Sequence, residues 1–265
     1  MDSQEVDHAP APKRQCVHNT NPASATTVHI GDCVNVMREH MTTDHVDLIV
    51  TSPPYNANKR HEDQQRWMTK DEYGDFTQRW MTEACRVLKP GHGMFVNIGY
   101  WSGSRGKRYF LPTLLIERAE RCGLTLSGWI NWVKDKNGLS QTRGCGWGDT
   151  YSTSPFFMNG SEPILYFRKA GRQRHRDNRH DEWMRMVREP WIMKPKNMNK
   201  THDAVFPEEL PRRCIVMCSL PGDLVVDPFA GTGTVARVCE RLGRRCVLID
   251  RNDAHLREFI DRPSP

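Results

Sequence analysis

The sequence has little that would indicate a secreted, disulfide-stabilised or zinc-binding protein. Its nine cysteines are scattered over 265 residues, and no two of them form a Cys-x-x-Cys pair. The nearest two, Cys214 and Cys218, lie four residues apart in a helical pattern and are expected to face a core. Because structural zinc sites need closely spaced ligands, we predict no metal site and expect reduced thiols in an intracellular protein.

The chain also lacks a long hydrophobic run. No apolar stretch approaches the roughly 18 residues that a membrane-spanning helix needs. Residues 1–27 are polar and contain no apolar core of a signal peptide, so we expect a flexible tail there and no association with a membrane. With 37% hydrophobic and 26% charged residues, the rest of the chain, 28–265, is predicted to form one globular α/β domain.

Two familiar phosphate-binding motifs are missing, Gly-x-Gly-x-x-Gly and the Gly-Lys-Thr of a phosphate loop. A different glycine turn, Asp-Pro-Phe-Ala-Gly-Thr-Gly-Thr at 227–234, lies between a predicted strand and a predicted helix. Glycines let the backbone approach a ligand closely, and a helix N-terminus favours negative charge. An acid in front of the turn, Asp227, suits a nucleoside with a cationic amino-acid part better than a pyrophosphate. Asp250, at the end of the next strand, suits a ribose diol. The alternative is a helix-capping turn without a ligand.

A stiff turn, Thr-Ser-Pro-Pro-Tyr-Asn at 51–56, follows the apolar run 46–50, which is predicted to be a buried strand. Neither proline can donate a hydrogen bond, and each restricts the residue before it. The strand must therefore stop abruptly, with a small polar residue before the prolines and an aromatic ring after them. Ligands of open α/β sheets bind at this carboxyl edge.

Strands and helices alternate along the chain, which predicts a mostly parallel sheet covered on both faces. The apolar patterns indicate strands at 28–30, 46–50, 93–98, 124–133, 162–168, 223–227 and 245–250. Helical spacing is seen at 33–41, 71–88, 109–122, 207–220, 234–242 and 253–260, with residues 89–91 ending the second of these helices.

Positive charge is concentrated in one segment. Residues 168–200 contain eleven Lys or Arg against four Asp or Glu, which accounts for the whole net charge of +6. The segment is either a solvated charged loop or a surface that binds phosphates. Its composition does not decide between these two interpretations.

The two turns together resemble the catalytic and S-adenosylmethionine motifs of the DNA amino-methyltransferases. The catalytic turn precedes the glycine turn, as in the beta group of that family, and the resemblance covers about residues 28–260. Segments 86–91 and 206–210 also fit the family pattern. The resemblance implies a circularly permuted Rossmann-like methyltransferase fold, in which 223–227, 245–250 and 28–30 are spatially the first three strands.

The resemblance also implies the residues that would bind S-adenosyl-L-methionine. Asp32, with the backbone near Cys33, would contact the adenine, and Asp250 the ribose. The glycine turn would line the methionine part, and 202–206 would close over it. The full expected set is Asp32, Cys33, Thr51, His202, Phe206, Asp227, Phe229, Ala230, Gly231, Thr232, Gly233, Thr234 and Asp250.

The turn Ser52, Pro53, Pro54 and Tyr55 would then be catalytic. The lone pair of an exocyclic amine is delocalised into its ring. The Ser52 hydroxyl and the Pro53 carbonyl can accept the amine hydrogens and favour a pyramidal nitrogen, while Tyr55 stacks on a base flipped out of the duplex. No Pro-Cys turn for methylation of cytosine C5 is present. Serine before Pro-Pro-Tyr resembles the cytosine-N4 members, whereas Asp or Asn there resembles most adenine-N6 members.

Double-stranded DNA is the expected partner. The recognition insertion is predicted at about 169–201, and the residues expected to contact DNA are Lys59, Arg60, Arg66, Arg143, Arg174, Arg176, Arg179 and Arg185. A homodimer and a cognate restriction endonuclease are further partners compatible with the resemblance. Alternative functions are an adenine-N6 enzyme, a catalytically silent DNA-binding relative, and a methyltransferase acting on RNA or a small molecule.

Overall fold

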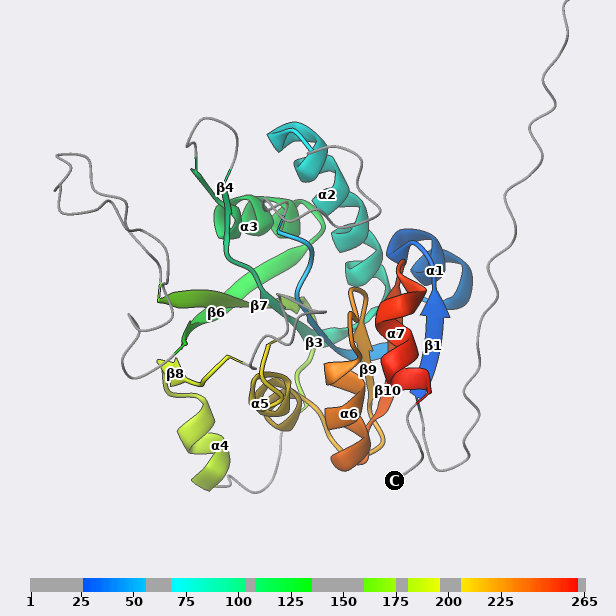
Figure 1. Ribbon diagram of the computed structural model, residues 1–265. Helices are drawn as coiled ribbons and strands as arrows, with labels where there is room; N and C mark the ends of the chain where they lie inside the picture. The colour runs from blue at the N-terminus through cyan, green and yellow to red at the C-terminus, as the bar shows by residue number, and fades with distance from the viewer. Residues whose placement is uncertain are drawn as a thin grey trace, which may run out of the picture.

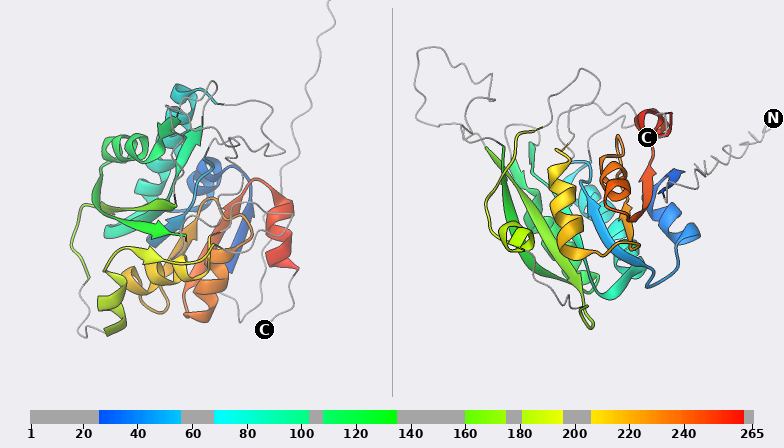
Figure 2. Two further views of the ribbon diagram at one scale, coloured as in Figure 1. Left: turned by 60° about the vertical axis from the view of Figure 1, so that its left-hand side comes forward. Right: turned by 90° about the horizontal axis from the view of Figure 1, so that it is seen from below.

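An eight-stranded sheet with helices on both faces organises the computed structural model (Figures 1 and 2). The structure describes residues 26–55, 68–102, 108–134, 160–174, 181–195 and 206–261. The strands of the sheet are β1 (Thr26–Ile30), β2 (Val46–Thr51), β3 (Leu88–Asn97), β6 (Leu124–Val133), β7 (Ser161–Lys169), β8 (Trp191–Ile192), β9 (Leu224–Asp227) and β10 (Arg245–Asp250). A separate antiparallel pair is formed by β4 (Tyr100–Ser102) and β5 (Arg108–Phe110).

The strand order is β1-β10-β9-β2-β3-β7-β6-β8. Neighbours from β1 to β3 are parallel, β7 is antiparallel to β3 and to β6, and β8 is parallel to β6. The last strands of the chain, β9 and β10, therefore lie between the first two, β1 and β2. This order confirms the predicted permuted Rossmann-like fold with a mostly parallel sheet.

Two apolar clusters lie on the two faces of the sheet. The helices α1 (Cys33–His40), α2 (Lys70–Val87) and α3 (Leu111–Arg121) contribute to one, and α5 (Glu209–Cys218), α6 (Thr234–Arg241) and α7 (Asp253–Ile260) to the other. Strand β2 is buried along its whole length and supplies both clusters, Ile49 to the first and Leu48 and Val50 to the second. Burial on both faces explains why this strand is almost continuously apolar.

The expected strands and helices are present, with shifted ends in places. The strand predicted at 124–133 coincides with β6. Helix α2 ends at Val87, and Leu88 is already extended and begins β3, so residues 89–91 lie in the strand instead of ending the helix. The helix predicted at 207–220 is shorter, with Pro211 in its first turn, where a missing N–H costs little.

The described part of the basic segment is built into the scaffold. Lys169 ends β7, residues 181–186 form α4 (Asp181–Met186), and Trp191–Ile192 add β8 to the edge of the sheet beside β6. β8 runs in the same direction as β3 and pairs with Trp132 and Val133, the last two residues of β6, so it lies at the carboxyl end of that strand. The described residues of the predicted recognition insertion at 169–201 thus extend the sheet, while α4 packs beside α5 (Figure 1). The role of this insertion in recognition stays a prediction.

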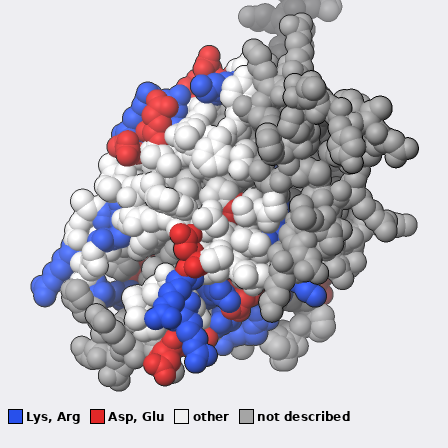
Figure 3. All heavy atoms as spheres, turned by 90° about the vertical axis from the view of Figure 1, so that its left-hand side faces the viewer, with Lys and Arg blue, Asp and Glu red and all other residues white. Residues whose placement is uncertain are grey.

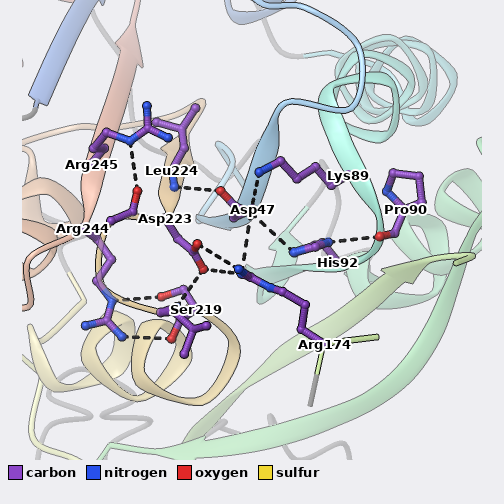
Figure 4. Close-up of polar contacts among 12 residues, drawn as sticks. Asp47, Lys89, Pro90, His92, Arg174, Ser219, Asp223, Leu224, Arg244 and Arg245 are labelled. Atoms are coloured by element: carbon purple, nitrogen blue, oxygen red, sulfur yellow. Dashed lines mark hydrogen bonds and ion pairs between the residues drawn. The ribbon is translucent and has the colours of Figure 1, made fainter. Parts of the chain in front are cut away.

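A buried carboxylate at the amino edge of the parallel strands links several elements (Figure 4). Asp47 of β2 accepts from Lys89 Nζ at 2.7 Å and from the backbone N–H of Leu224 at 3.0 Å, and Arg174 Nη2 lies 3.7 Å away. Burial alone would raise the pKa of Asp47, but these partners hold it below its usual value. The acid therefore fits inside an apolar strand because its charge is compensated.

Candidate active site

The two sequence motifs meet at the carboxyl edge of the sheet. β2 and β9 are neighbours, so Thr51 and Asp227 end adjacent strands. The Thr51 hydroxyl donates to Asp227 Oδ1 at 2.7 Å, and the backbone N–H of Phe229 donates to the same oxygen at 3.1 Å. The first of these bonds joins residues 176 positions apart. It lies where the strand order reverses, which is where ligands of open α/β sheets bind.

The Asp227 carboxyl is buried at 2% exposure and has no cation beside it among its described contacts. Burial raises the pKa of Asp227 to about 7. The two hydrogen bonds act in the opposite direction and lower this pKa, whereas the charge of Asp250 adds a smaller increase. A buried acid in this state is poised to ionise when a positive group comes next to it.

The glycine turn after β9 has the backbone conformation that its sequence predicts. Gly231 and Gly233 have positive φ angles of 49° and 74°. A Cβ on Gly233 would lie 2.7 Å from the Phe259 ring of α7. Arg237 of α6 donates to the Thr232 carbonyl at 2.6 Å, which fixes the turn. The Thr232 hydroxyl is buried and has no hydrogen-bond partner in the described part of the chain, so it is available to a ligand.

The two acids after β10 and β1 are already bonded within the protein. Asp250 accepts from the Gly231 N–H at 2.8 Å and from the Asn252 N–H at 2.9 Å. Asp32 caps α1 by accepting from the N–H groups of residues 34 and 35, and it forms an ion pair with Arg251. Burial would raise the pKa of Asp32, but its bond to Arg251 and the cap lower it overall. Asp250 thus holds the glycine turn in place from the neighbouring strand.

Other residues of the expected cofactor set lie around the same edge. The Phe229 ring packs edge-on against Phe76 and Trp80, at centroid distances of 5.9 and 5.4 Å, so it anchors the turn to α2. Cys33 is buried in the first core cluster, and burial raises its pKa to about 12. The remaining described members are placed as follows: Ala230 and Thr234 buried in the turn, and Phe206 half-buried against the second cluster. His202 lies outside the described residues.

The turn expected to be catalytic, 52–55, is held by side chains that the sequence did not single out. The Tyr73 hydroxyl of α2 donates to the Pro54 carbonyl at 2.8 Å. The Tyr55 hydroxyl lies 3.1 Å from Glu162 Oε2 and 3.3 Å from Asn97 Oδ1. The Ser52 hydroxyl lies 3.4 Å from the Tyr55 hydroxyl. The pKa of Tyr55 is raised well above its ordinary value, mainly by burial and to a smaller extent by the charge of Glu162.

The polar residues around Tyr55 share one feature that is visible in the sequence, which is their position near the ends of predicted strands. Asn97 ends β3, Glu162 is the second residue of β7, and Lys134 follows β6 and pairs with Glu162. Since β6 and β7 are antiparallel, with Val133 opposite Ser161, their ends meet at the edge where β2 ends. A search for polar residues at strand ends would have found all three.

The arginines expected to contact DNA are not gathered at this site where the structure describes them. Arg174 pairs with Asp223, just before β9, at the amino edge (Figure 4). Arg185 is exposed on α4, which packs against α5. On the face shown in Figure 3, Lys and Arg mingle with acids toward the lower end, and few charges lie in the middle. The other six lie outside the described residues: Lys59, Arg60, Arg66, Arg143, Arg176 and Arg179.

Over the same described residues, no group of three or more His, Cys, Asp or Glu could hold a metal ion. None of the described helices is long and apolar enough to cross a membrane.

Known proteins are similar to this chain over most of its length. Type II methyltransferase M.Cfr9I of Citrobacter freundii is 30% identical, with 93% of this chain and 91% of that protein aligned. Type II methyltransferase M.HpaI of Haemophilus parainfluenzae is 28% identical, over 87% of this chain and 72% of that protein.

Solved structures have the same fold. A Thermus thermophilus protein described as a DNA modification methylase, in complex with S-adenosyl-L-methionine, has a TM-score of 0.62 and 26% identity, over 87% of this chain and 90% of that one. The cytosine-N4-specific PvuII DNA methyltransferase has a TM-score of 0.70 and 19% identity, over 90% and 86%. The family described as DNA methylase matches residues 46–261, and the chain therefore belongs to the DNA methylase family.

Proposed function

We propose that this protein transfers a methyl group from S-adenosyl-L-methionine to the exocyclic N4 amine of a cytosine flipped out of double-stranded DNA. The observation that carries the proposal is the Thr51–Asp227 hydrogen bond, which fixes the catalytic turn beside the glycine turn. A methyl donor bound at one turn would thereby face an amine held at the other.

The residues around the glycine turn fit S-adenosyl-L-methionine. This cofactor carries a cationic ammonium and a cationic sulfonium, and Asp227 is a buried acid without a cation next to it among its described contacts. The Thr232 hydroxyl, unpaired within the described residues, offers a hydrogen bond inside the same turn. Asp250 and Asp32 would face the ribose and the adenine, because Asp250 ends β10 and Asp32 follows β1, the next two strands of the sheet.

The bound cofactor would supply an electrophilic methyl group, and the protein would supply alignment. Ser52 Oγ and the Pro53 carbonyl would accept the two hydrogens of the target amine and direct its lone pair at the methyl group. Tyr55, beside Gly99, would border the flipped base. Holding nitrogen, methyl carbon and sulfur in line lowers the barrier without a covalent intermediate.

The choice of cytosine rests on Ser52, since serine at this position resembles the N4 members of the family. The likeness to the PvuII enzyme, at 19% identity, concerns the fold and does not decide the base. Adenine N6 is the second candidate, because the two bases present a similar amine edge.

DNA would approach the carboxyl edge, where the catalytic turn lies. The chain leaves this edge after Tyr55 and after Lys134, and the following segments contain Lys59, Arg60, Arg66 and Arg143. We assign phosphate contacts to these four residues first. Arg174 is engaged by Asp223 at the amino edge, and Arg176, Arg179 and Arg185 stay predictions.

The deciding experiment is methylation of DNA in vitro, followed by digestion to nucleosides and mass spectrometry. We expect N4-methylcytosine that depends on added S-adenosyl-L-methionine. N6-methyladenine would replace the proposal with the adenine enzyme. Neither product, from folded protein that binds DNA, would indicate the catalytically silent relative.

Two substitutions separate the roles of the two turns. Ser52→Ala should lower methyl transfer by about 100-fold while changing the cofactor dissociation constant little, because the serine would contact the target amine and not the cofactor. Asp250→Ala should raise that dissociation constant, because the acid would bind the ribose and also holds the Gly231 N–H. Equal losses of catalysis and cofactor binding in Ser52→Ala would mean that the catalytic turn is misassigned.

A further inference from the structure

We propose that Glu162 is a positioning residue that acts through Tyr55 to keep the Ser52 oxygen a hydrogen-bond acceptor for the target amine. This inference rests on the proposed function, since it requires an amine at Ser52. It adds to the catalytic turn a residue from β7, which is distant in the sequence.

The contacts form a short chain from Glu162 to Ser52. Glu162 Oε2 lies 3.1 Å from the Tyr55 hydroxyl, which in turn lies 3.4 Å from Ser52 Oγ. The other carboxylate oxygen of Glu162 is engaged by Lys134 Nζ, whose ammonium also lies 5.4 Å from the centre of the Trp132 ring. Glu162 is thus held from one side and presents its second oxygen to Tyr55.

The direction of these hydrogen bonds follows from the available protons. Tyr55 has one hydroxyl proton and faces two acceptors, Glu162 Oε2 and Asn97 Oδ1. The Asn97 amide is oriented by its own N–H bond to the Pro163 carbonyl at 3.3 Å, so its oxygen faces the tyrosine. Tyr55 must therefore donate its proton to this acceptor pair, of which the carboxylate is the nearer and the stronger.

Once Tyr55 donates toward Glu162, its oxygen can only accept from Ser52. The Ser52 proton then points at Tyr55 and away from the place of the amine. Both remaining lone pairs of Ser52 Oγ are free to accept an N–H. Without the Glu162 carboxylate, Tyr55 keeps only the weaker acceptor of this pair, the Asn97 amide oxygen at 3.3 Å. The tyrosine could then turn its proton toward Ser52, whose own proton would face the amine nitrogen and oppose its lone pair.

This arrangement addresses a problem that is particular to serine. A carboxylate at the same position is always an acceptor, whereas a hydroxyl can donate or accept. The carboxylate missing at position 52 is present at Glu162, two hydrogen bonds away from Ser52 through Tyr55. Its side chain is only 18% exposed, so water competes weakly for the Tyr55 proton.

The test is a double-mutant cycle with Glu162→Gln and Tyr55→Phe, read out as kcat, KM for DNA and the cofactor dissociation constant. Glu162→Gln should lower kcat about ten- to a hundredfold, as expected for loss of a hydrogen bond to a charged group, with cofactor binding within about twofold. In the Tyr55→Phe background the same change should have almost no further effect, because the connection to Ser52 is already broken. Glu117→Gln, which removes an exposed carboxylate paired with Arg121 on α3, is the matched control and should leave kcat unchanged.

Equal loss of kcat from Glu162→Gln in both backgrounds, or no loss in either, would overturn the proposal. Thermal unfolding of each variant separates these outcomes from misfolding. A second measurement does not need activity: the Tyr55 hydroxyl proton in tyrosine-labelled protein, identified by its loss in Tyr55→Phe, should move upfield in Glu162→Gln. If wild-type protein methylates adenine, or nothing, the proposed function fails, whereas an unmoved resonance would refute the Glu162–Tyr55 bond.

Discussion

Cofactor binding should depend on pH through Asp227. In the free protein burial raises the pKa of this carboxyl to about 7. A cationic ammonium or sulfonium next to it would stabilise the ionised form and lower that pKa. Binding then requires the carboxylate and releases a proton wherever the free protein still carries it. The affinity for S-adenosyl-L-methionine should therefore rise with pH up to about 7 and level off above it.

The magnitude follows from the fraction of ionised Asp227. With a free-state pKa of about 7 and a bound-state pKa at least about two units lower, the dissociation constant should be about tenfold higher at pH 6 than at pH 8. Between these pH values the same titration predicts release of up to about one proton per cofactor bound. Both effects have the same sign, because a ligand that prefers the ionised form binds better as the proton is lost.

Isothermal titration calorimetry in two buffers of different ionisation enthalpy measures the affinity and the proton release together. Asp227→Asn is the control, because an amide is isosteric and does not titrate. It should bind more weakly at pH 8 and lose the pH dependence. A wild-type dissociation constant that is flat from about pH 6 to pH 8 would refute the reasoning, as would an unchanged slope in Asp227→Asn.

The raised pKa of Asp227 also makes the stability of the cofactor-free protein depend on pH. Because the folded-state pKa of Asp227 lies above the ordinary value of 3.8, the folded protein keeps a proton that the unfolded chain loses. This group therefore contributes stability below about pH 4 that is lost as the pH rises to about 7, up to about 4 kcal/mol in all. Urea unfolding of wild type and Asp227→Asn at several pH values would isolate this contribution.

Three further predictions concern the glycine turn, the amino edge and DNA. Gly233→Ala should lower the free energy of unfolding in urea by about 2–4 kcal/mol, because the new side chain combines a positive φ with a clash against Phe259. Gly123→Ala, at a positive φ in open space, is the control and should lower it by only about 1 kcal/mol. Arg174→Gln should lower the free energy of unfolding by about 1 kcal/mol and change DNA affinity less than about twofold, since its partner is Asp223; a large loss of DNA binding would contradict its structural role. Neutralisation of about six phosphates predicts a roughly thousandfold loss of DNA affinity between about 50 and 200 mM salt, and a fluorescence titration without salt dependence would exclude this mode of binding.

Much of the fold could be predicted because its signals are local. The apolar run before Pro53, the glycines after Asp227 and the spacing of α2 each report the conformation of their own segment. Alternating strands and helices then leave few arrangements other than a parallel sheet. Some element ends were less predictable. β3 begins at Leu88 instead of the expected 93, because Pro90 and Gly91 are typical of a break between elements but lie inside this strand.

The sequence alone determined the chemistry at two turns: an acceptor and an aromatic ring at Ser52 and Tyr55, and an acid with glycines at 227–233. These need only a few neighbouring residues, whose conformational limits are their own. Only the tertiary structure decided what surrounds them. Glu162 reaches Tyr55 because β6 ends and antiparallel β7 begins at the carboxyl edge. The described part of the basic segment is divided between the two edges, because Arg174 pairs with Asp223 at the amino edge whereas β8 pairs with the last two residues of β6. Composition cannot reveal on which edge of a sheet a charged segment lies, because strand pairing over long distances sets that position.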